Sequence, residues 1–284
     1  MTIFTNVTVL GAGVLGSQIA FQTAFKGFSV TSYDVNDDAL AAAATRFDDL
    51  VTTYENEVPG AGDGAARTAR ERITLTSDLA QAAAHADLII EAIPEILDLK
   101  LDTYRKLATL APESTIFATN SSTLLPSDLA PATGRPDRFL ALHFANRVWQ
   151  FNTAEIMGTD QTDPKVYAAV VEFASAIGME PIELHKEKAG YVLNSLLVPF
   201  LNAALELTAD GYAEPADVDK TWRIATGAPL GPFQIYDVVG LMTPYHILMQ
   251  GDEHNQHLGA WLKNNYIDQG KLGMASGEGF YSYR

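Results

Sequence analysis

The chain has 284 residues and carries 19 Lys and Arg against 35 Asp and Glu, a formal net charge of −16. A chain this acidic repels nucleic-acid backbones at long range, so general nucleic-acid binding is not expected. The sequence contains no cysteine, which excludes disulfides, thiolate nucleophiles and cysteine-ligated metals together. The length is enough to bury a large apolar core and favours about two domains.

The N-terminal region and the hydropathy of the chain bear on where the protein works. The first residues show no basic flank followed by an apolar core, so no signal peptide is expected. An apolar run of about 18 residues, as a membrane-spanning helix needs, is absent from the sequence. We therefore expect a soluble, cytoplasmic protein with no membrane partner.

Strand-like and helix-like stretches alternate through the first two thirds of the chain. A short strand at residues 7–10 runs into a glycine-rich turn and then a helix that ends near Lys26. Further helices are predicted at residues 37–57, 67–72, 98–110 and 164–177, and further strands at 28–33, 87–93, 115–118, 139–144, 153–157 and 181–184. This alternation predicts an α/β Rossmann-type fold with a doubly wound parallel sheet.

The pattern changes after about residue 185, where only helical stretches follow. These lie at residues 192–207, 215–225, 245–252 and 257–265. We predict two domains, an α/β domain at 1–187 and an all-helical domain at 188–284. The stretch at 192–207 is apolar on more than one face, which suits burial inside a helical bundle or in a dimer interface.

Gly11, Gly13 and Gly16 form a GxGxxG motif between a predicted strand and a predicted helix. In that setting the first glycine allows a tight turn, the second lets the backbone approach a pyrophosphate, and the third lets helix and strand pack closely. Free N–H groups at the helix N-terminus favour the same anion. The motif therefore predicts a dinucleotide site, with a purely structural turn as the alternative.

The second predicted strand ends at Asp34, which bears on the choice of cofactor. A carboxylate there accepts hydrogen bonds from both ribose hydroxyls of an adenosine and repels a 2′-phosphate. The residues that follow at once, Val35-Asn-Asp-Asp38, contain no Arg or Lys to offset that repulsion. We therefore expect NAD rather than NADP.

A series of further motifs follows in order along nearly the whole chain. They are Val9-Leu-Gly-Ala-Gly-Val-Leu-Gly16, Ile90-Glu-Ala-Ile-Pro-Glu95, Ala118-Thr-Asn-Ser-Ser-Thr-Leu124, His143-Phe-Ala-Asn146, Ala154-Glu-Ile156, Gly190-Tyr-Val-Leu-Asn194, Pro229-Leu-Gly-Pro-Phe233, Asp237-Val-Val-Gly-Leu241 and Gly277-Glu-Gly-Phe-Tyr281. In this order and spacing the chain resembles the 3-hydroxyacyl-CoA dehydrogenase family, including the bacterial 3-hydroxybutyryl-CoA dehydrogenases.

The resemblance implies a Rossmann domain that binds NAD, a helical domain that forms a homodimer, and a place in fatty acid metabolism. The family's catalytic residues fall on His143 and its partner acid Glu155, with the polar pair around the substrate on Ser122 and Asn194. The expected cofactor-binding residues are Gly11, Gly13, Val14, Leu15, Gly16, Asp34, Glu95, Lys100, Ser122 and Asn146.

The chemistry implied for His143 agrees with its residue type. Oxidation of a secondary alcohol needs a base for the hydroxyl proton, and the reverse reaction needs an acid, both of which a histidine can be near neutral pH. A turn near Trp149 would bring residues 143 and 155 opposite each other, because 149 is their midpoint. We therefore predict a hydrogen-bonded His143–Glu155 pair, with a histidine satisfied by backbone groups as the alternative.

Ser122 and Asn194 are neutral hydrogen-bonding side chains that can hold the substrate's 3-oxygen as charge develops. Their alternatives are a turn serine and a helix asparagine, because Asn120-Ser-Ser-Thr123 also has the composition of a turn. The remaining histidines form no tight ligand cluster, and we predict no metal site.

Several departures from the family pattern concern the substrate. The family's His-Phe-Phe-Asn-Pro becomes His143-Phe-Ala-Asn-Arg147, which opens volume and adds a cation beside the active histidine. The family's phosphate-binding lysines are also missing, since no lysine lies between Lys26 and Lys100. Arginines can replace them because a guanidinium binds phosphate in a bidentate manner. The candidates are Arg67, Arg70 and Arg72, for which an ordinary solvated helix face is the alternative.

Three functions follow from these observations. The leading one is NAD-dependent interconversion of a short-chain L-3-hydroxyacyl-CoA and its 3-oxo form, with His143 as general base and acid. The second keeps the reaction but takes a free 3-hydroxy acid, as in relatives similar to gulonate or carnitine dehydrogenases, with Arg147 binding the carboxylate. The third is a non-catalytic NAD-binding protein, which the presence of His143, Glu155, Ser122 and Asn194 argues against.

Overall fold

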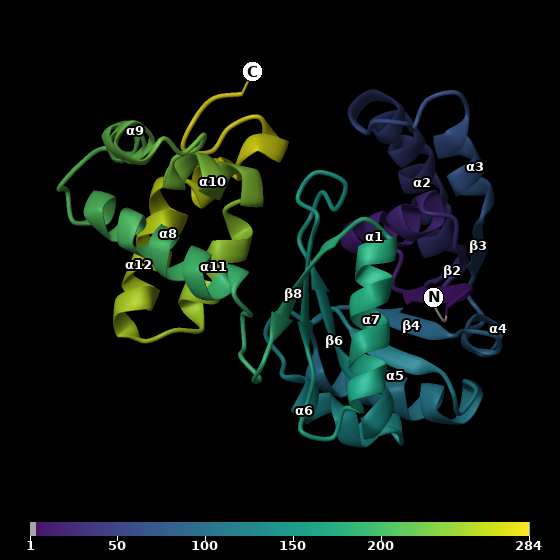
Figure 1. Cartoon of the computed structure of the whole chain (residues 1–284). Helices are drawn as coiled ribbons and strands as arrows, with labels where there is room; N and C mark the ends of the chain where they lie inside the picture. Colours follow the sequence, from purple (N-terminus) through teal and green to yellow (C-terminus); the bar gives the residue numbers. More distant parts are fainter. Residues whose placement is uncertain (1–3, 284) are drawn as a thin grey trace. The chain divides into compact units, whose positions relative to one another are not determined.

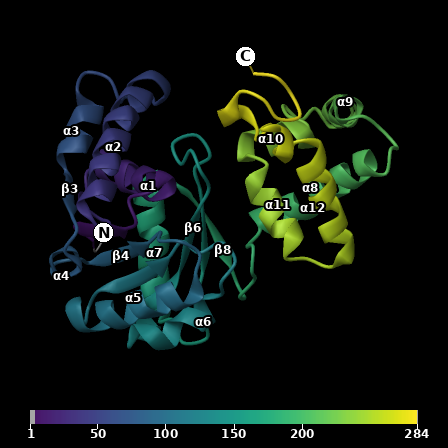
Figure 2. The same cartoon turned by 180° about the vertical axis from the view of Figure 1, so that it is seen from behind.

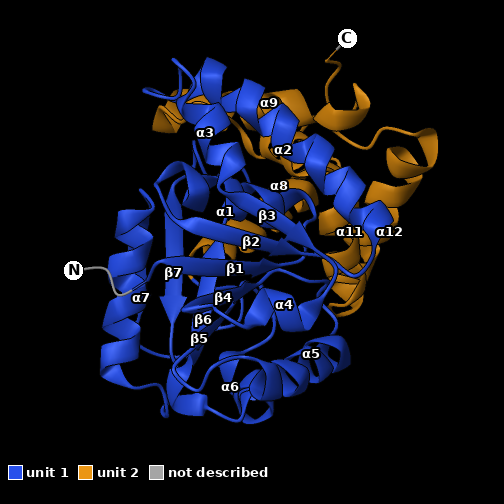
Figure 3. Ribbon diagram, turned by 90° about the vertical axis from the view of Figure 1, so that its right-hand side faces the viewer, with its two compact units in different colours: residues 1–191 blue, residues 192–284 orange. Residues whose placement is uncertain are grey.

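The computed structural model describes residues 4–283 and divides the chain into two compact units, residues 1–191 and 192–284 (Figure 3). The strands of the first unit are β1 (Asn6–Leu10), β2 (Ser29–Tyr33), β3 (Ile73–Thr76), β4 (Leu88–Glu91), β5 (Ile116–Thr119), β6 (Phe139–Phe144), β7 (Thr153–Met157) and β8 (Glu180–Leu184). Its helices are α1 (Val14–Phe25), α2 (Asp37–Glu57), α3 (Ala65–Glu71), α4 (Leu79–Ala83), α5 (Leu97–Leu110), α6 (Pro126–Leu129) and α7 (Pro164–Ala176), with 3₁₀ turns η1 (Ala130–Thr133) and η2 (Pro136–Arg138).

The strands within residues 4–283 form one sheet in the order β3-β2-β1-β4-β5-β6-β7-β8. Strands β1 to β6 are parallel, β7 runs antiparallel to β6, and β8 is parallel to β7. The strand order reverses beside β1, which has β2 on one side and β4 on the other. The carboxyl ends of β1 and β4 are therefore the switch point at which doubly wound sheets bind ligands. The predicted fold class is confirmed.

Apolar side chains cover both faces of the sheet. Successive residues of β4 show the alternation, because Leu88 and Ile90 pack into one core and Ile89 into the other. Helices α1, α2 and α7 contribute to the first core, and α4, α5 and α6 to the second. Figures 1 and 2 show α7 and α5 on opposite sides of the strands. Burial on both faces explains why these strands have nearly continuous apolar sequences.

Local sequence signals account for most element ends. Helix α2 has the predicted bounds, because Asn36 caps it through a hydrogen bond from Ala39 N, and Asp37 and Asp38 lie in its first turn. The sequence analysis did not predict β3, α4, α6 or, in the second unit, α10. Strand β3 lies at the edge of the sheet with a partly exposed Ile-Thr-Leu-Thr sequence, so it lacks the continuous apolar run of the buried strands. Helices α4 and α6 have only five and four residues, which is too short to show a helical period.

The second unit is helical, as predicted. It contains α8 (Leu193–Ala209), α9 (Pro215–Thr226), α10 (Pro232–Val239), α11 (Met242–Met249), α12 (Glu253–Asn265), η3 (Ile267–Gln269) and η4 (Met274–Ser276). Its core gathers Leu201, Leu205, Phe233, Leu258 and Leu262. No helix in the described part of the chain is long and apolar enough to cross a membrane.

The boundary between the units lies four residues later than the sequence analysis placed it. Tyr191 belongs to the first unit because its ring packs on His143 and its hydroxyl donates to Ser121 O. The predicted homodimer stays a prediction. In the second unit Leu196, Trp222 and Ile224 are exposed apolar side chains that such an interface can cover.

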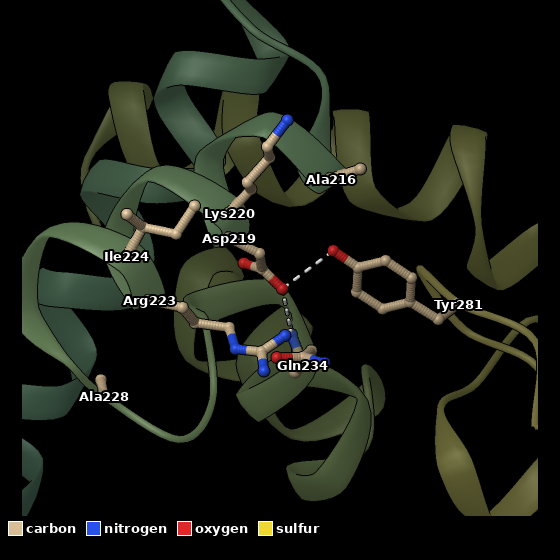
Figure 4. Close-up of a pocket in the computed structure, with 8 residues that line it drawn as sticks. All are labelled: Ala216, Asp219, Lys220, Arg223, Ile224, Ala228, Gln234 and Tyr281. Carbon is tan, nitrogen blue, oxygen red and sulfur yellow. Dashed lines mark hydrogen bonds between the residues drawn. The ribbon is translucent and has the colours of Figure 1, made fainter.

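Two buried carboxylates hold the C-terminal segment of the second unit. Asp237 accepts hydrogen bonds from Phe280 N, Tyr281 N and the Tyr283 hydroxyl. Asp219 borders a cavity of about 430 Å³, where it accepts from Gln234 N and the Tyr281 hydroxyl (Figure 4). Because these carboxylates serve the packing of the chain's end, we give them a structural role.

The fit of Gly279 against Asp237 leads to a prediction about stability. A Cβ at position 279 would lie 2.0 Å from Asp237 Oδ1. We expect Gly279→Ala to lower the free energy of unfolding by about 1–3 kcal/mol, as overpacking does. The control is Gly62→Ala, where a Cβ meets no atom within 4 Å. The urea concentration at the midpoint of unfolding measures the stability of both variants. An unchanged midpoint in Gly279→Ala contradicts the close packing of Gly279 against Asp237.

Candidate active site

The glycine-rich turn after β1 has the geometry of a dinucleotide-binding loop. Gly11 has a φ of +91° and a Cβ there would lie 2.5 Å from Ala92 O, so no other residue fits without strain. A Cβ on Gly16 would lie 1.9 Å from Gly11 O, so the glycine lets α1 approach the turn. Both glycines are required by the protein's own packing.

Gly13 differs from its two neighbours, because a Cβ there would meet no protein atom within 4 Å. It caps α1 without a side-chain hydrogen bond, and the first turn of α1 contains no acidic residue. Val14 is exposed beside it and Leu15 is half-buried. The helix N-terminus thus presents N–H groups to an uncrowded position, as a pyrophosphate requires.

Asp34 lies at the carboxyl end of β2, next to this loop. Its Oδ2 accepts from Ala12 N at 2.9 Å and its Oδ1 from Val35 N at 2.8 Å. The sequence analysis missed Arg46, which reaches back from α2 and donates to Ala12 O at 3.0 Å. It lies 12 positions beyond Asp34, so a search of the adjacent residues does not find it.

His143 and Glu155 are neighbours across β6 and β7. The antiparallel register places them directly opposite each other, and His143 Nδ1 lies 3.0 Å from Glu155 Oε2. Both side chains are buried. The predicted hydrogen-bonded pair is present, with geometry that orients an imidazole and stabilises its charged form.

Ser122 lies on the other side of the imidazole, in the loop after β5. Its Oγ is 3.1 Å from His143 Nε2, so Ser122, His143 and Glu155 form a continuous hydrogen-bonded line. A substrate oxygen that lies beside this contact can come within hydrogen-bonding distance of both Ser122 Oγ and His143 Nε2. Asn146 is exposed in the loop after β6. Asn194 lies in α8 of the second unit, and its contact with the substrate stays a prediction.

A buried ion pair lies under the loop that bears Ser122. Lys100 Nζ is 2.6 Å from Glu91 Oε1, and both side chains are almost fully buried. Lys100 also contacts Glu95 Oε2 at 3.2 Å and Ile93 O at 3.4 Å. These contacts occupy the three donors of its ammonium group. Lys100 therefore holds Glu95 in place, and its expected contact with the cofactor stays a prediction.

Glu95 in turn organises the loop after β5. Its Oε1 accepts from Ser121 Oγ at 2.5 Å, Ser122 N at 3.0 Å and Thr123 N at 2.8 Å. Burial by itself would raise the pKa of Glu95, but the Ser121 hydrogen bond, the Lys100 charge and the Thr123 hydrogen bonds outweigh it and lower the pKa to about 2. Glu95 is therefore ionised at neutral pH.

The structure does not bring the four candidate arginines together at this site. Three pair with carboxylates, Arg67 with Glu55, Arg70 with Asp48 and Arg147 with Glu57. Arg72 donates to Ala24 O and precedes β3, so it lies at the amino edge of the sheet, opposite the glycine loop. We therefore assign none of these four arginines to the proposed substrate site.

Within residues 4–283, no group of three or more His, Cys, Asp or Glu side chains is arranged to hold a metal ion.

A Rossmann sheet with an open pyrophosphate loop, and a histidine–carboxylate pair at the same edge, define a nicotinamide-dependent dehydrogenase. Residues 6–188 match the family model of the 3-hydroxyacyl-CoA dehydrogenase NAD-binding domain, and residues 190–283 match that of its C-terminal domain. The chain belongs to the 3-hydroxyacyl-CoA dehydrogenase family. It is an NAD-dependent oxidoreductase.

Individual members of the family match the sequence of this chain over nearly its whole length. The mitochondrial hydroxyacyl-coenzyme A dehydrogenase of Mus musculus is 35% identical over 98% of this chain and 91% of its own length. A probable 3-hydroxybutyryl-CoA dehydrogenase of Bacillus subtilis is 31% identical over 98% of this chain and 97% of its own. A solved diketoreductase, described by its dual catalysis of dicarbonyl compounds, is 67% identical over 100% of both chains, with a TM-score of 0.97.

The contrast between Gly13 and Gly16 gives a prediction about cofactor binding. We expect Gly13→Ala to leave the unfolding temperature unchanged and to raise the Kd for NADH about tenfold or more, because only the cofactor meets the added methyl. Gly16→Ala is expected to lower the unfolding temperature as well, since its methyl meets Gly11 O. Fluorescence titration with NADH measures binding. Equal NADH affinity in wild type and Gly13→Ala contradicts this placement of the pyrophosphate.

The lowered pKa of Glu95 gives a prediction about pH. Its ionised form adds stability that is fully present above pH about 4.5 and is lost as the pH falls towards 2. Glu95→Gln is therefore expected to unfold at a lower temperature than wild type at pH 7, with the difference narrowing below pH 4.5. Thermal scans between pH 3 and 8 measure this, with the exposed Glu113→Gln as control. A difference that does not depend on pH argues against a charge effect.

Proposed function

We propose that the protein reduces one carbonyl of a 1,3-dicarbonyl compound to the 3-hydroxy product with NADH, and catalyses the reverse oxidation with NAD. The observation that carries this proposal is the line from Ser122 through His143 to Glu155, with separations of 3.1 and 3.0 Å. The line lies at the sheet edge that also bears the dinucleotide loop.

The nicotinamide supplies a hydride to the carbonyl carbon when it is bound. His143 Nε2 donates a proton to the carbonyl oxygen, so that one hydride and one proton complete the alcohol. Glu155 accepts from Nδ1 and stabilises the charged imidazole before the transfer. Ser122 Oγ donates a hydrogen bond to the same oxygen as negative charge develops on it. In the oxidation direction His143 removes the hydroxyl proton.

We further propose that the preferred dicarbonyl substrate lacks the coenzyme A arm. Arg67, Arg70 and Arg72, the candidates for its phosphates, contact protein groups instead. A net charge of −16 also disfavours a highly charged thioester. The likeness to the diketoreductase, at 67% identity over the full length, supports the same substrate class.

The second candidate is a short-chain L-3-hydroxyacyl-CoA with its 3-oxo partner, the leading function of the sequence analysis. It is favoured by the family and by the relatives named for this activity. A free 3-hydroxy acid has less support than before, because Arg147 Nη2, its candidate carboxylate ligand, lies 3.0 Å from Glu57 Oε2 in this structure.

The test compares NADH oxidation with 2,4-pentanedione, ethyl 3-oxobutanoate, free acetoacetate and acetoacetyl-CoA at pH 7. We expect the two uncharged dicarbonyls to have a kcat/KM at least about tenfold above that of acetoacetyl-CoA, a difference of roughly 1.4 kcal/mol in transition-state binding. A higher kcat/KM for the thioester supports the second candidate instead.

His143→Gln tests the catalytic assignment. We expect kcat to fall about 100- to 10,000-fold, the usual contribution of a general acid, while the Kd for NADH changes little. The matched control is His85→Gln, an exposed histidine of the same unit. Unchanged turnover in His143→Gln contradicts the role of His143 as the group that donates and removes the proton.

A further inference from the structure

Tyr191 lies directly against the proposed acid–base group. Its ring stacks on the imidazole of His143, with 4.4 Å between the ring centroids and 10° between the planes. Its side chain is buried, at 1% exposure. The imidazole is thus held at its edge by Glu155 and on its face by Tyr191.

The hydroxyl of Tyr191 contacts the loop that bears Ser122. It donates to Ser121 O at 2.7 Å. Burial raises the pKa of Tyr191, with the charges of Glu95, Glu155 and Glu91 adding to the effect, so the phenol keeps the proton it donates. The preceding residue acts on the same loop, since Gly190 N donates to Ser122 O at 3.1 Å. Residues 190–191 therefore hold the carbonyl groups of both serines.

The backbone of Tyr191 is in an unfavourable conformation. Its φ is +50°, in the left-handed region that bulky side chains rarely adopt. Strain of this kind persists where the surrounding structure requires it, and it gathers at functional sites. A ring that only filled space would not need this conformation, as buried Tyr54 shows from its regular position within α2.

We propose that Tyr191 is a positioning residue that sets the plane of the His143 ring and the place of Ser122 together, so that Nε2 and Oγ meet one substrate oxygen. This inference rests on the proposed function. The stacked face stops the imidazole from turning about its Cβ–Cγ bond, and the hydroxyl stops the serine loop from moving away. Tyr191 itself does not touch the reacting atoms in this scheme.

Two substitutions separate the ring from the hydroxyl. Tyr191→Phe keeps the stack and loses the hydrogen bond to Ser121 O, so we expect kcat to fall about three- to tenfold, the effect of one hydrogen bond. Tyr191→Leu loses both, and we expect a fall of about 100-fold, as for a misplaced catalytic group. In both, the KM for NADH and for the dicarbonyl substrate is expected to stay within about twofold of wild type, since a positioning role acts on the chemical step.

The matched control is Tyr54→Phe, which also removes one buried phenol hydrogen bond, the one from Tyr54 to Gln22 Oε1, and lies outside the site. Its kcat is expected to equal that of wild type. Thermal unfolding and NADH titration establish that each variant is folded. If Tyr191→Leu does not fold, the test rests on Tyr191→Phe. An unchanged kcat in Tyr191→Phe then overturns the proposal.

Two results overturn the positioning role while leaving the proposed function intact. One is a kcat of Tyr191→Leu within about twofold of wild type. The other is a loss that appears only in the KM of the dicarbonyl substrate, which makes Tyr191 a pocket wall. Failure of the proposed function has a different signature, which is a wild-type protein that does not reduce the dicarbonyl substrate with NADH. A kcat that is higher in Tyr191→Phe than in Tyr191→Leu supports a role for the ring that stacks on His143.

Discussion

The antiparallel pairing of β6 with β7 is the constraint on which the site depends. It places His143 opposite Glu155 in a buried part of the sheet. A slip of one residue in this register would turn one of the two side chains to the opposite face and remove the pair. The loop between the strands is held against the helices of the same unit, through Arg147 N to Gln18 and Trp149 Nε1 to Glu57. The geometry of the His143–Glu155 pair is thus set by the pairing of two strands.

The carboxylates of this acidic chain gain their roles through pairing. Glu91 is fully buried and is matched by Lys100, which in turn contacts Glu95. A buried charge is tolerated only where it is paired and hydrogen-bonded, and these are. The result is that the loops after β4 and β5 are joined at the sheet edge. Because Glu95 also accepts a hydrogen bond from Ser122 N, the buried ion pair fixes the loop that bears the Ser122 hydroxyl.

Long elements and local motifs were predictable from the sequence, and short or distant features were not. Helix α2 and strands β6 and β7 have the bounds expected from their patterns. Strand β3 was missed because it is a partly exposed edge strand without a continuous apolar run, and helix α4 because five residues show too little periodicity. Among the site residues, the pairing of His143 with Glu155 followed from the midpoint of a turn. The stacking of Tyr191 on His143 had no such signal, although Tyr191 lies in a motif that the sequence displays.

The sequence by itself determined the fold class, the dinucleotide loop and the residue types of the acid–base pair. These are encoded locally, because a strand, its glycine turn and the following helix are adjacent in the chain. Only the tertiary structure decided which polar groups meet. It joined Arg147 to Glu57 across 90 residues and Tyr191 to Ser121 across 70, and it directed Lys100 to Glu91. The physical reason is that such contacts depend on how loops pack at the sheet edge, where long-range geometry outweighs any local pattern.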